Sequence, residues 1–433
     1  MKRQNGTGGH RGSSALERRL RFGFVAAATL ASAAVAGLVA CATSDDAGET
    51  REPDPHVLVV EDAGAEASSD ADASAPCVTD CEYFPPTCSE DVLCSNGLFD
   101  PNGADPIDDR VTIQVIRGRS ATDVWVVGGG GTQRRFDGQA WIRSELPKNS
   151  HLQVGGTPSS ETLWLRDGSE VGFTGLSLFA NAYSRGLVAT ADGGVESADG
   201  WTKNARPMIA GRRPYDPDSQ HVLAGWSVPG AEAFWLATVE PGTPPVSGLV
   251  RLAVTDTSDP TNPALFFGQV MVLDQAVFTA LHGASADDFW AVGMHGVTLH
   301  VTGANDATPT LKHYNSRTRN ALHGVWAAAP SDVWAVGYSG TVRHYTGDDS
   351  LWELVEGIPE SVMFNAIYGT SASDIWAIGN DATVYHYDGV AWSRVKIAGL
   401  GPKRPNLVSV WAADPEHVWI GGEGIVLSLG GKP

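Results

Sequence analysis

The segment 365–396, NAIYGTSASDIWAIGNDATVYHYDGVAWSRVK, decides the fold. It contains four short runs of alternating apolar residues, NAIYG, IWAIG, TVYHY and AWSRVK, which are separated by the polar turns TSASD, NDA and DG. Alternating apolar residues with Gly and Asp at the breaks are typical of antiparallel strands joined by tight hairpins. The segment therefore predicts one four-stranded antiparallel sheet.

The centre of this segment recurs along the chain. Clear copies are ATDVWVVG (121–128), ADDFWAVG (286–293), SDVWAVG (331–337), SDIWAIG (373–379) and EHVWIGG (416–422), and weaker ones are SETLWLRDG and AEAFWLATV. Each copy has a marker tryptophan, and the seven are Trp125, Trp164, Trp235, Trp290, Trp334, Trp376 and Trp419. The last four stand 44, 42 and 43 residues apart. This is the length of one propeller blade, so residues 111–433 are predicted to form an all-β, seven-bladed β-propeller with four-stranded antiparallel blades.

The last copy has only three strands, LVSVWAA, HVWIGG and IVLSL. Propellers commonly complete their last blade with a strand from the other end of the chain. We expect that strand between Leu93 and Arg110, around Leu98 and Phe99. Deletion of the residues up to Arg110 should then open the ring and make it sensitive to proteases.

The first 40 residues have the layout of a bacterial secretion signal. Six Lys and Arg residues precede an uncharged stretch, 22–40, that ends in Leu38-Val39-Ala40-Cys41. This ending resembles the lipobox of bacterial lipoproteins, and the resemblance implies cleavage before Cys41 and acylation of its thiol. By the same resemblance, Ala42 after the anchor Cys favours sorting to the outer membrane. The predicted location is therefore a lipid anchor on the bacterial cell envelope, at its periplasmic or cell-surface face. An uncleaved signal anchor is the alternative, because 19 uncharged residues approach the length of a membrane helix.

Residues 41–76 consist mainly of Ala, Asp, Glu, Ser and Gly, with Arg51 as the one basic residue after the anchor. A segment with so little to bury predicts a disordered, acidic tether. Loss of the leader would change the formal net charge from −20 to −25, because the leader holds six Lys and Arg and one acid. Nucleic acid is therefore excluded as a partner. The charge is also explained as a solubility feature, and we expect a monomer.

The segment 77–110 holds the other cysteines, namely Cys77, Cys81, Cys88 and Cys94. An even, clustered set in an exported protein indicates two disulfides, and three pairings are possible. A four-thiolate zinc site is the alternative, but the spacing lacks the paired CxxC knuckles of zinc ribbons. We therefore expect disulfides that brace the junction between tether and propeller, and no metal or cofactor.

The SDVWAVG...HYDG..W pattern resembles the tectonin-like and BNR (Asp-box)-like propeller repeats of bacterial secreted and surface lipoproteins. The resemblance covers about three quarters of the chain and implies the fold, whereas propellers have many functions. The Asp-box S-x-D-x-G-x-x-W has no clean match, and Asp192-Gly193-Gly194 is a partial one. This departure weakens any analogy with sialidases.

Equivalent positions converge only near the axis of a propeller. The position eight residues before the marker tryptophan ends the first strand, which lines the central channel, and there the sequence has Arg117, His282, Trp326, Tyr368 and Trp411. Such a ring suits a sugar or an anionic group. The alternative is that these side chains only pack between blades. His300, His344, His386 and Arg135 fall on the third strand, far from the axis, and are interpreted as scaffold.

The sequence lacks G-x-S-x-G, H-E-x-x-H, phosphate-loop and dinucleotide motifs. We therefore expect no catalytic residues and a noncatalytic module that binds carbohydrate or another protein at the envelope. A propeller-type glycoside hydrolase or lyase is the alternative, and it would need acids or a His-Arg set that converge at the channel. A structural envelope scaffold is a third possibility. Residues 166–185 and 240–275 are interpreted as insertions in blades 2 and 3.

Overall fold

The computed structural model describes residues 80–103, 105–146, 160–174, 181–187, 199–204, 208–210, 221–240, 245–254, 266–274 and 276–433. The chain divides into two units, Met1–Ser69 and Asp70–Pro433, and all of these residues belong to the second. The predicted leader, Cys41, the tether and Cys77 lie outside them. Within the described ranges, no helix has the length and apolarity needed to cross a membrane.

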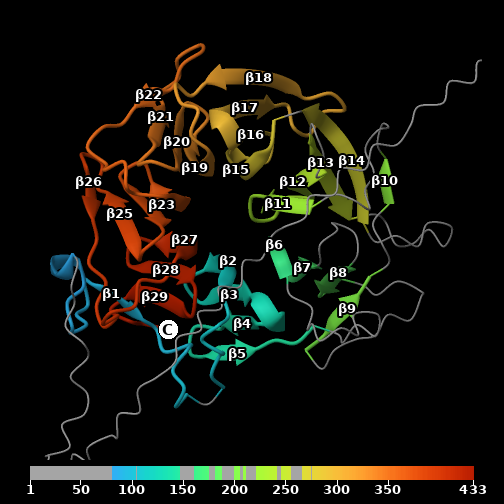
Figure 1. Cartoon of the computed structure of the whole chain (residues 1–433). Coiled ribbons are helices and arrows are strands. Elements are labelled where there is room, and N and C mark those ends of the chain that lie inside the picture. The colour runs from blue at the N-terminus through green and yellow to red at the C-terminus, as the bar shows by residue number, and fades with distance from the viewer. Residues whose placement is uncertain are drawn as a thin grey trace, which may run out of the picture. The chain divides into compact units, whose positions relative to one another are not determined.

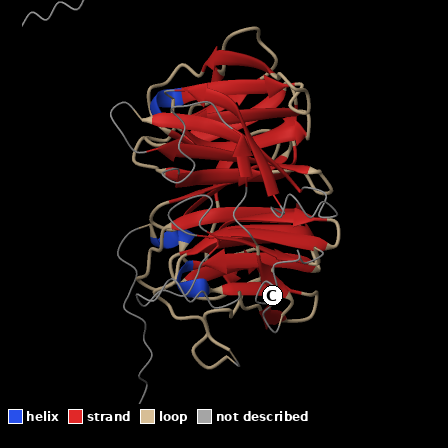
Figure 2. Cartoon of the chain, turned by 90° about the vertical axis from the view of Figure 1, so that its right-hand side faces the viewer, coloured by secondary structure: helices blue, strands red, loops and turns tan. Residues whose placement is uncertain are grey.

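Seven antiparallel sheets stand around a central axis like the blades of a propeller (Figure 1), and their strands run from one face of the ring to the other (Figure 2). The predicted seven-bladed propeller is confirmed. Consecutive sheets come from consecutive parts of the chain, because each hairpin-rich repeat folds on itself before the chain moves to the next blade.

Each blade has its innermost strand at the axis, and its other strands follow in order towards the rim. Blade 1 comprises β2 (Ile113–Ser120), β3 (Asp123–Gly128), β4 (Gln133–Phe136) and β5 (Trp141–Arg143). Blade 2 comprises β6 (Ser160–Arg166), β7 (Ser169–Thr174), β8 (Asn181–Arg185) and β9 (Trp201–Lys203). Blade 3 comprises β11 (His221–Trp226), β12 (Ala233–Glu240), β13 (Val246–Val254) and β14 (Phe266–Asp274), with β10 (Met208–Ala210) as a fifth, parallel strand on β14.

Blade 4 comprises β15 (Phe278–Ser285), β16 (Asp288–Gly293), β17 (Val297–Thr302) and β18 (Thr310–Asn315). Blade 5 comprises β19 (Leu322–Ala329), β20 (Asp332–Gly337), β21 (Val342–Tyr345) and β22 (Glu353–Leu354). Blade 6 comprises β23 (Phe364–Ser371), β24 (Asp374–Gly379), β25 (Thr383–Tyr387) and β26 (Trp392–Arg394). Blade 7 comprises β27 (Leu407–Asp414), β28 (His417–Gly422), β29 (Ile425–Leu429) and β1 (Leu93–Ser95). Short 3-10 turns are η1 (Cys81–Tyr83), η2 (Gly129–Gly131) and η3 (Met294–Gly296).

The glycine that ends each clear copy of the motif is required by a close backbone approach. At Gly293, Gly337 and Gly379, a Cβ atom would overlap the carbonyl oxygen of the residue that precedes the innermost strand of the same blade. The next residue uses that carbonyl, as Tyr338 N donates to Ala321 O at 3.1 Å. Because only glycine leaves room for this contact, the Gly of the motif fixes where the second strand turns away from the first.

The hydrophobic core lies between neighbouring blades rather than within one sheet. Trp290 of blade 4 is fully buried and packs with the side chains of Leu322, Val333 and Trp352 of blade 5. A flat indole ring fills the wedge between two twisted sheets, and each such ring buries roughly 150–250 Å². The marker tryptophans therefore hold each blade to the next one.

Strand β1 closes the ring by pairing with the C-terminal strand. Leu93 lies opposite Leu429 and Ser95 lies opposite Leu427. Leu93 is fully buried and also bridges Ile397 of blade 6. The closing strand lies at the start of the predicted range of Leu93 to Arg110, and not around Leu98 and Phe99. Leu98 lies in a turn and packs its buried side chain against blades 1 and 7.

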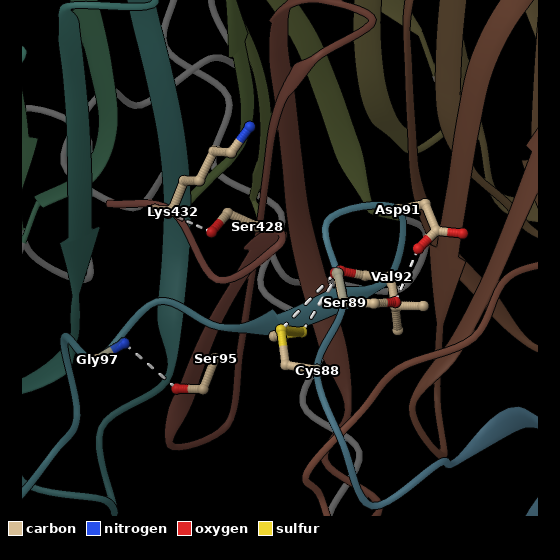
Figure 3. Close-up of a disulfide and its surroundings, with 9 residues drawn as sticks. Cys88, Ser89, Asp91, Val92, Ser95, Gly97, Ser428 and Lys432 are labelled. Atoms are coloured by element: carbon tan, nitrogen blue, oxygen red, sulfur yellow. Dashed lines mark hydrogen bonds between the residues drawn. A yellow bond between two sulfur atoms is a disulfide. The ribbon is translucent and has the colours of Figure 1, made fainter.

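A disulfide joins Cys88 to Cys94 and closes a short loop against β1 (Figure 3). The two Cα atoms are 6.0 Å apart, and Cys94 itself belongs to β1. Cys81 is also disulfide-bonded. These covalent bonds leave Cys88 and Cys94 no thiolate for zinc, and they hold the closing strand beside the end of the chain, where Ser428 Oγ donates to Lys432 O.

Blades 2 and 3 differ from the strand assignment and the insertions that their sequences predict. Trp164 lies on β6, the innermost strand of blade 2, whereas the other marker tryptophans lie on second strands. The segment 166–185 is not an insertion, since it supplies β7 and β8. In the segment 240–275 the extra length forms β13 and β14, which are nine residues each and exceed the strands of the other blades.

Candidate functional site: the central channel

The third-strand side chains are held by a repeated contact away from the axis. His300, His344 and His386 each hydrogen-bond the aspartate that begins the second strand, at 2.8, 2.7 and 2.6 Å, and lie against the marker tryptophan. In blade 1, Arg135 makes the same contact with Asp123 at 2.8 Å. Burial tends to raise the pKa of Asp374, but hydrogen bonds from His386 and Thr370 outweigh it and lower that pKa. These polar groups are therefore used in holding each blade together.

A charged groove between blades 1 and 2 has a cavity volume of about 780 Å³. Arg119 contacts Asp123 at 2.7 Å and Glu170 at 2.9 Å, and Arg185 reaches Glu170 at 3.5 Å. Glu170 thus has two cationic partners. Because these charges neutralise one another, the groove has little net attraction for a charged ligand.

The five residues predicted for the channel all lie on innermost strands, but they divide into two groups. Trp326 and Trp411 are buried, and each indole covers the glycine of the next blade, Gly369 and Gly118 respectively. Arg117, His282 and Tyr368 are half-buried and line the channel itself. Both tryptophans therefore pack between blades, and Trp411 in addition lines one end of the channel, whereas the other three side chains converge at the axis.

The three convergent side chains form the waist of the channel, with a cavity on either side. Cavity A, at the end where the innermost strands finish, measures about 370 Å³, and cavity B, where they begin, measures about 460 Å³. Arg117, His282 and Tyr368 line both. Among the residues that the structure describes, no Asp or Glu lines either cavity. The described part of the channel wall therefore offers hydrogen-bond donors and aromatic faces, and no carboxylate.

Arg117 brings a cation into this waist without a carboxylate partner among the described residues. Its guanidinium makes only long contacts to backbone carbonyls, from Nη1 to Ile116 O at 3.4 Å and from Nη2 to Gly225 O at 3.5 Å. Burial lowers the pKa of Arg117, and the Tyr368 phenol opposes this shift. The pKa of Arg117 falls because its half-buried surroundings solvate the guanidinium charge less well than water does.

His282 is a neutral hydrogen-bond donor. Its Nδ1 accepts the backbone N–H of Ala327 at 3.1 Å, so the ring proton is on Nε2. Burial, together with the Arg117 guanidinium, lowers the pKa of His282 to about 3. An imidazole with this pKa stays neutral at physiological pH, and its free edge donates into the channel.

Tyr368 completes the waist. Its ring centroid lies 6.0 Å from that of His282 and 6.4 Å from that of Trp411, whose side chain is its hydrogen-bond partner. Burial raises the pKa of Tyr368, although the Arg117 guanidinium opposes the shift. The phenol is therefore protonated near neutral pH and keeps a hydrogen to donate.

Trp226 and a second ring of residues belong to the channel and were missed. Trp226 ends β11 and lies 5.9 Å from His282, but it precedes its marker tryptophan by nine residues rather than eight. The second ring lines cavity B. Each of its members stands three residues before Trp226 or before one of the five residues predicted for the channel, and they are Gln114, Leu223, Thr279, His323, Asn365 and Val408. The sequence contains the signal for this ring, because most of its members stand at a constant distance before the marker tryptophan, three residues further away than the predicted channel residues.

The polar members of the second ring mainly join neighbouring blades. Asn365 Nδ2 donates to Leu407 O at 2.8 Å, and Thr279 Oγ1 donates to Leu322 O. His323 lies against Tyr338, with ring centroids 4.3 Å apart, and its Nε2 is buried without a hydrogen-bond partner in the part of the chain described. Burial lowers the pKa of His323. Thr279 and Asn365 therefore have hydrogen bonds between blades and are not free to bind a ligand.

Acid should destabilise the propeller through His282. The unfolded imidazole takes up a proton near pH 6.5, whereas the folded one stays neutral down to about pH 3. Between these values the unfolded chain binds more protons, so the free energy of unfolding falls as pH falls, by at most about 1.4 kcal/mol per pH unit. Allowing for solvent in the channel, His282→Gln should remove about 2 kcal/mol of this loss between pH 6.5 and pH 4.

Urea unfolding at several pH values measures this effect. His295→Asn, at an exposed turn, is the matched control and should keep the wild-type pH profile. Equal slopes for wild type and His282→Gln would contradict the assignment of the proton loss to His282.

Among the described residues, no three His, Cys, Asp or Glu side chains gather closely enough to hold a metal ion. Comparison with known proteins returns no matching family model and no matching curated protein. Many solved structures share the fold. One of YCF48 bound to D1 peptide is 14% identical, with a TM-score of 0.53, and covers 80% of this chain and 96% of that one.

Two further solved structures are as similar. YCF48 from Cyanidioschyzon merolae has 11% identity and a TM-score of 0.52, and covers 74% of this chain and 96% of its own. A catalytically inactive virginiamycin B lyase from Staphylococcus aureus with quinupristin has 11% identity and a TM-score of 0.52, and covers 74% and 94%. At these identities the likeness establishes the propeller fold, and it does not transfer a ligand or a reaction.

Proposed function

We propose that this protein is a noncatalytic binding module of the bacterial cell envelope, held there through lipidated Cys41, and that it takes a segment of a protein partner into the central channel. The observation that carries the proposal is the composition of the channel, whose described lining combines hydrogen-bond donors with aromatic faces and includes no carboxylate. The solved YCF48 structure with a D1 peptide supports peptide binding as a property that this fold accommodates.

A lyase or hydrolase is the second candidate, because Arg117 and His282 do converge and one similar structure is a lyase. The environment of the three waist residues opposes it. A general base near neutral pH needs a free acceptor with a pKa close to 7. The Nδ1 atom of His282 is occupied and the pKa of that ring is about 3, while burial raises the pKa of Tyr368. Carbohydrate remains the alternative ligand for the same channel.

Blocking the mouth of cavity A tests the proposal. Ala413 lines this mouth and is half-buried, so Ala413→Trp should fill it. The Cys41→Ser protein, recovered without its leader, would be screened on peptide and glycan arrays. We expect peptide binding that Ala413→Trp weakens at least tenfold, since one excluded anchor group is worth more than about 1.4 kcal/mol.

Val390→Trp is the matched control, because Val390 is 87% exposed on a hairpin turn, and it should bind like the parent. Binding of glycans alone would replace the protein partner by a carbohydrate. Peptide binding that Ala413→Trp leaves intact would contradict the channel as the site.

A further inference from the structure

The unpaired guanidinium at the waist points to the chemistry of the ligand. We infer that Arg117, His282 and Tyr368 form a carboxylate-binding site, and that the ligand enters through cavity A with a carboxylate at its leading end. This inference rests on the proposed binding function and names the group that the channel recognises.

The first support is that no carboxylate among the described residues contacts the Arg117 guanidinium. A guanidinium that is partly withdrawn from water and has no carboxylate partner is costly, and proteins normally pair such a group or use it. The other arginine on the rim of cavity A, Arg119, is neutralised by Asp123 and Glu170. Arg117 is thus left as one uncompensated positive charge, which matches a single negative charge on the ligand.

The second support is the set of donors around Arg117. His282 Nε2–H and the Tyr368 hydroxyl line the same space, and neither donates to another group among the described residues. A guanidinium with two neutral donors supplies what the two oxygens of a carboxylate accept. Because the site carries one cation, a doubly charged phosphate would be left partly uncompensated in the channel.

The third support is the asymmetry of the two cavities. The walls of cavity A are mainly apolar and include Leu163, Leu165, Val228, Pro229 and Ala413. Cavity B is lined in part by polar side chains of the second ring, including Thr279 and Asn365. A carboxylate that reaches the waist through cavity A would carry an apolar group behind it. The α-carboxylate of a peptide with an apolar last residue has this form, and an acidic sugar shares only the carboxylate.

Thermal unfolding with small probes tests the site directly. Benzoate has one carboxylate on an apolar ring, and benzamide is its neutral counterpart. At millimolar concentrations and constant ionic strength, benzoate should raise the Tm of the Cys41→Ser protein by about 2 °C or more, as a ligand specific for the folded state does. Benzamide and inorganic phosphate should raise it much less.

Arg117→Met separates recognition from structure. The methionine removes an unpaired buried charge and keeps much of the apolar stem, so the Tm without ligand should rise, by about 2 °C. The same variant should lose the response to benzoate. Arg117→Lys keeps the charge but not the planar fork, and it should bind benzoate roughly 10-fold more weakly. The exposed Arg319→Gln, which removes one charge elsewhere, should behave like the parent.

The source of the carboxylate is distinguished by two further pairs of probes. Acetyl-Ala-Leu-Leu acid against its amide tests a peptide terminus, and methyl glucuronide against methyl glucoside tests an acidic sugar. Preference for either acid supports the carboxylate site and identifies its source. The inference is overturned if benzoate fails to stabilise the parent, if it stabilises Arg117→Met equally, or if Arg117→Met lowers the Tm. Array binding that survives in Arg117→Met but not in Ala413→Trp would overturn the inference and keep the proposed function.

Discussion

Leu93→Asp should open the ring and lower the free energy of unfolding by about 5 kcal/mol or more. Leu93 is fully buried in β1 between blades 6 and 7, where it lies opposite Leu429 and bridges Ile397. Truncation of a buried leucine alone costs about 2–5 kcal/mol. A carboxylate at the same place adds the cost of an unpaired buried charge. The loss should appear as a lower Tm and as rapid proteolysis of the folded protein.

Leu354→Asp is the matched control. Leu354 ends the outer edge of blade 5 and is 43% exposed, so the same substitution there should change the Tm little. Leu93→Ala should give an intermediate loss. If Leu93→Asp resisted proteases as well as Leu354→Asp does, the ring would not depend on β1.

Trp290→Ala should cost about 4 kcal/mol, the second largest effect that we expect. The indole is fully buried between blades 4 and 5, stacks on His300 at 4.3 Å and meets the edge of Trp352 at 5.1 Å. Its removal leaves a cavity that rigid sheets on both sides fill poorly, and Trp→Ala substitutions in cores cost about 3–5 kcal/mol. Urea unfolding would measure the change.

Trp141→Ala serves as the comparison, because Trp141 is half-buried on the outermost strand of blade 1. We expect a cost of about 1–2 kcal/mol there, as for a partly buried side chain. Similar losses at the two sites would contradict a core that lies between the inner parts of neighbouring blades.

The repeat in the sequence predicts the propeller because each blade folds from a contiguous segment. The pattern fails in blade 2, where Trp164 lies on the first strand. Side chains alternate between the two faces of the sheet in the same way in an innermost strand and in a second strand. An isolated tryptophan in an apolar run therefore does not show which of the two strands it belongs to. Trp226 was missed for a related reason, since the hairpin from Trp226 to Trp235 is one residue longer than in the well-kept blades.

The position eight residues before the marker tryptophan locates Arg117, His282 and Tyr368. It does not distinguish them from the buried Trp326 and Trp411. That difference depends on the neighbour across the blade boundary. Trp411 packs into the space that Gly118 leaves open, whereas Arg117 extends past blade 2 to reach Gly225 of blade 3. The unpaired state of Arg117 depends on which acids approach the axis from all the blades, and such long-range proximity is not encoded in local spacing.

The pairing of the first described strand with the last one sets the order of events in folding. β1 cannot pair until β29, the last strand described, has been made, and Ser409 Oγ donates to Ile113 O across 296 residues of chain. Single blades form from local hairpins, but their union into a ring needs a contact of very high contact order. Closure should therefore be the slow, final step of refolding, and an N-terminal fragment that lacks blade 7 should collapse into blades without completing the ring.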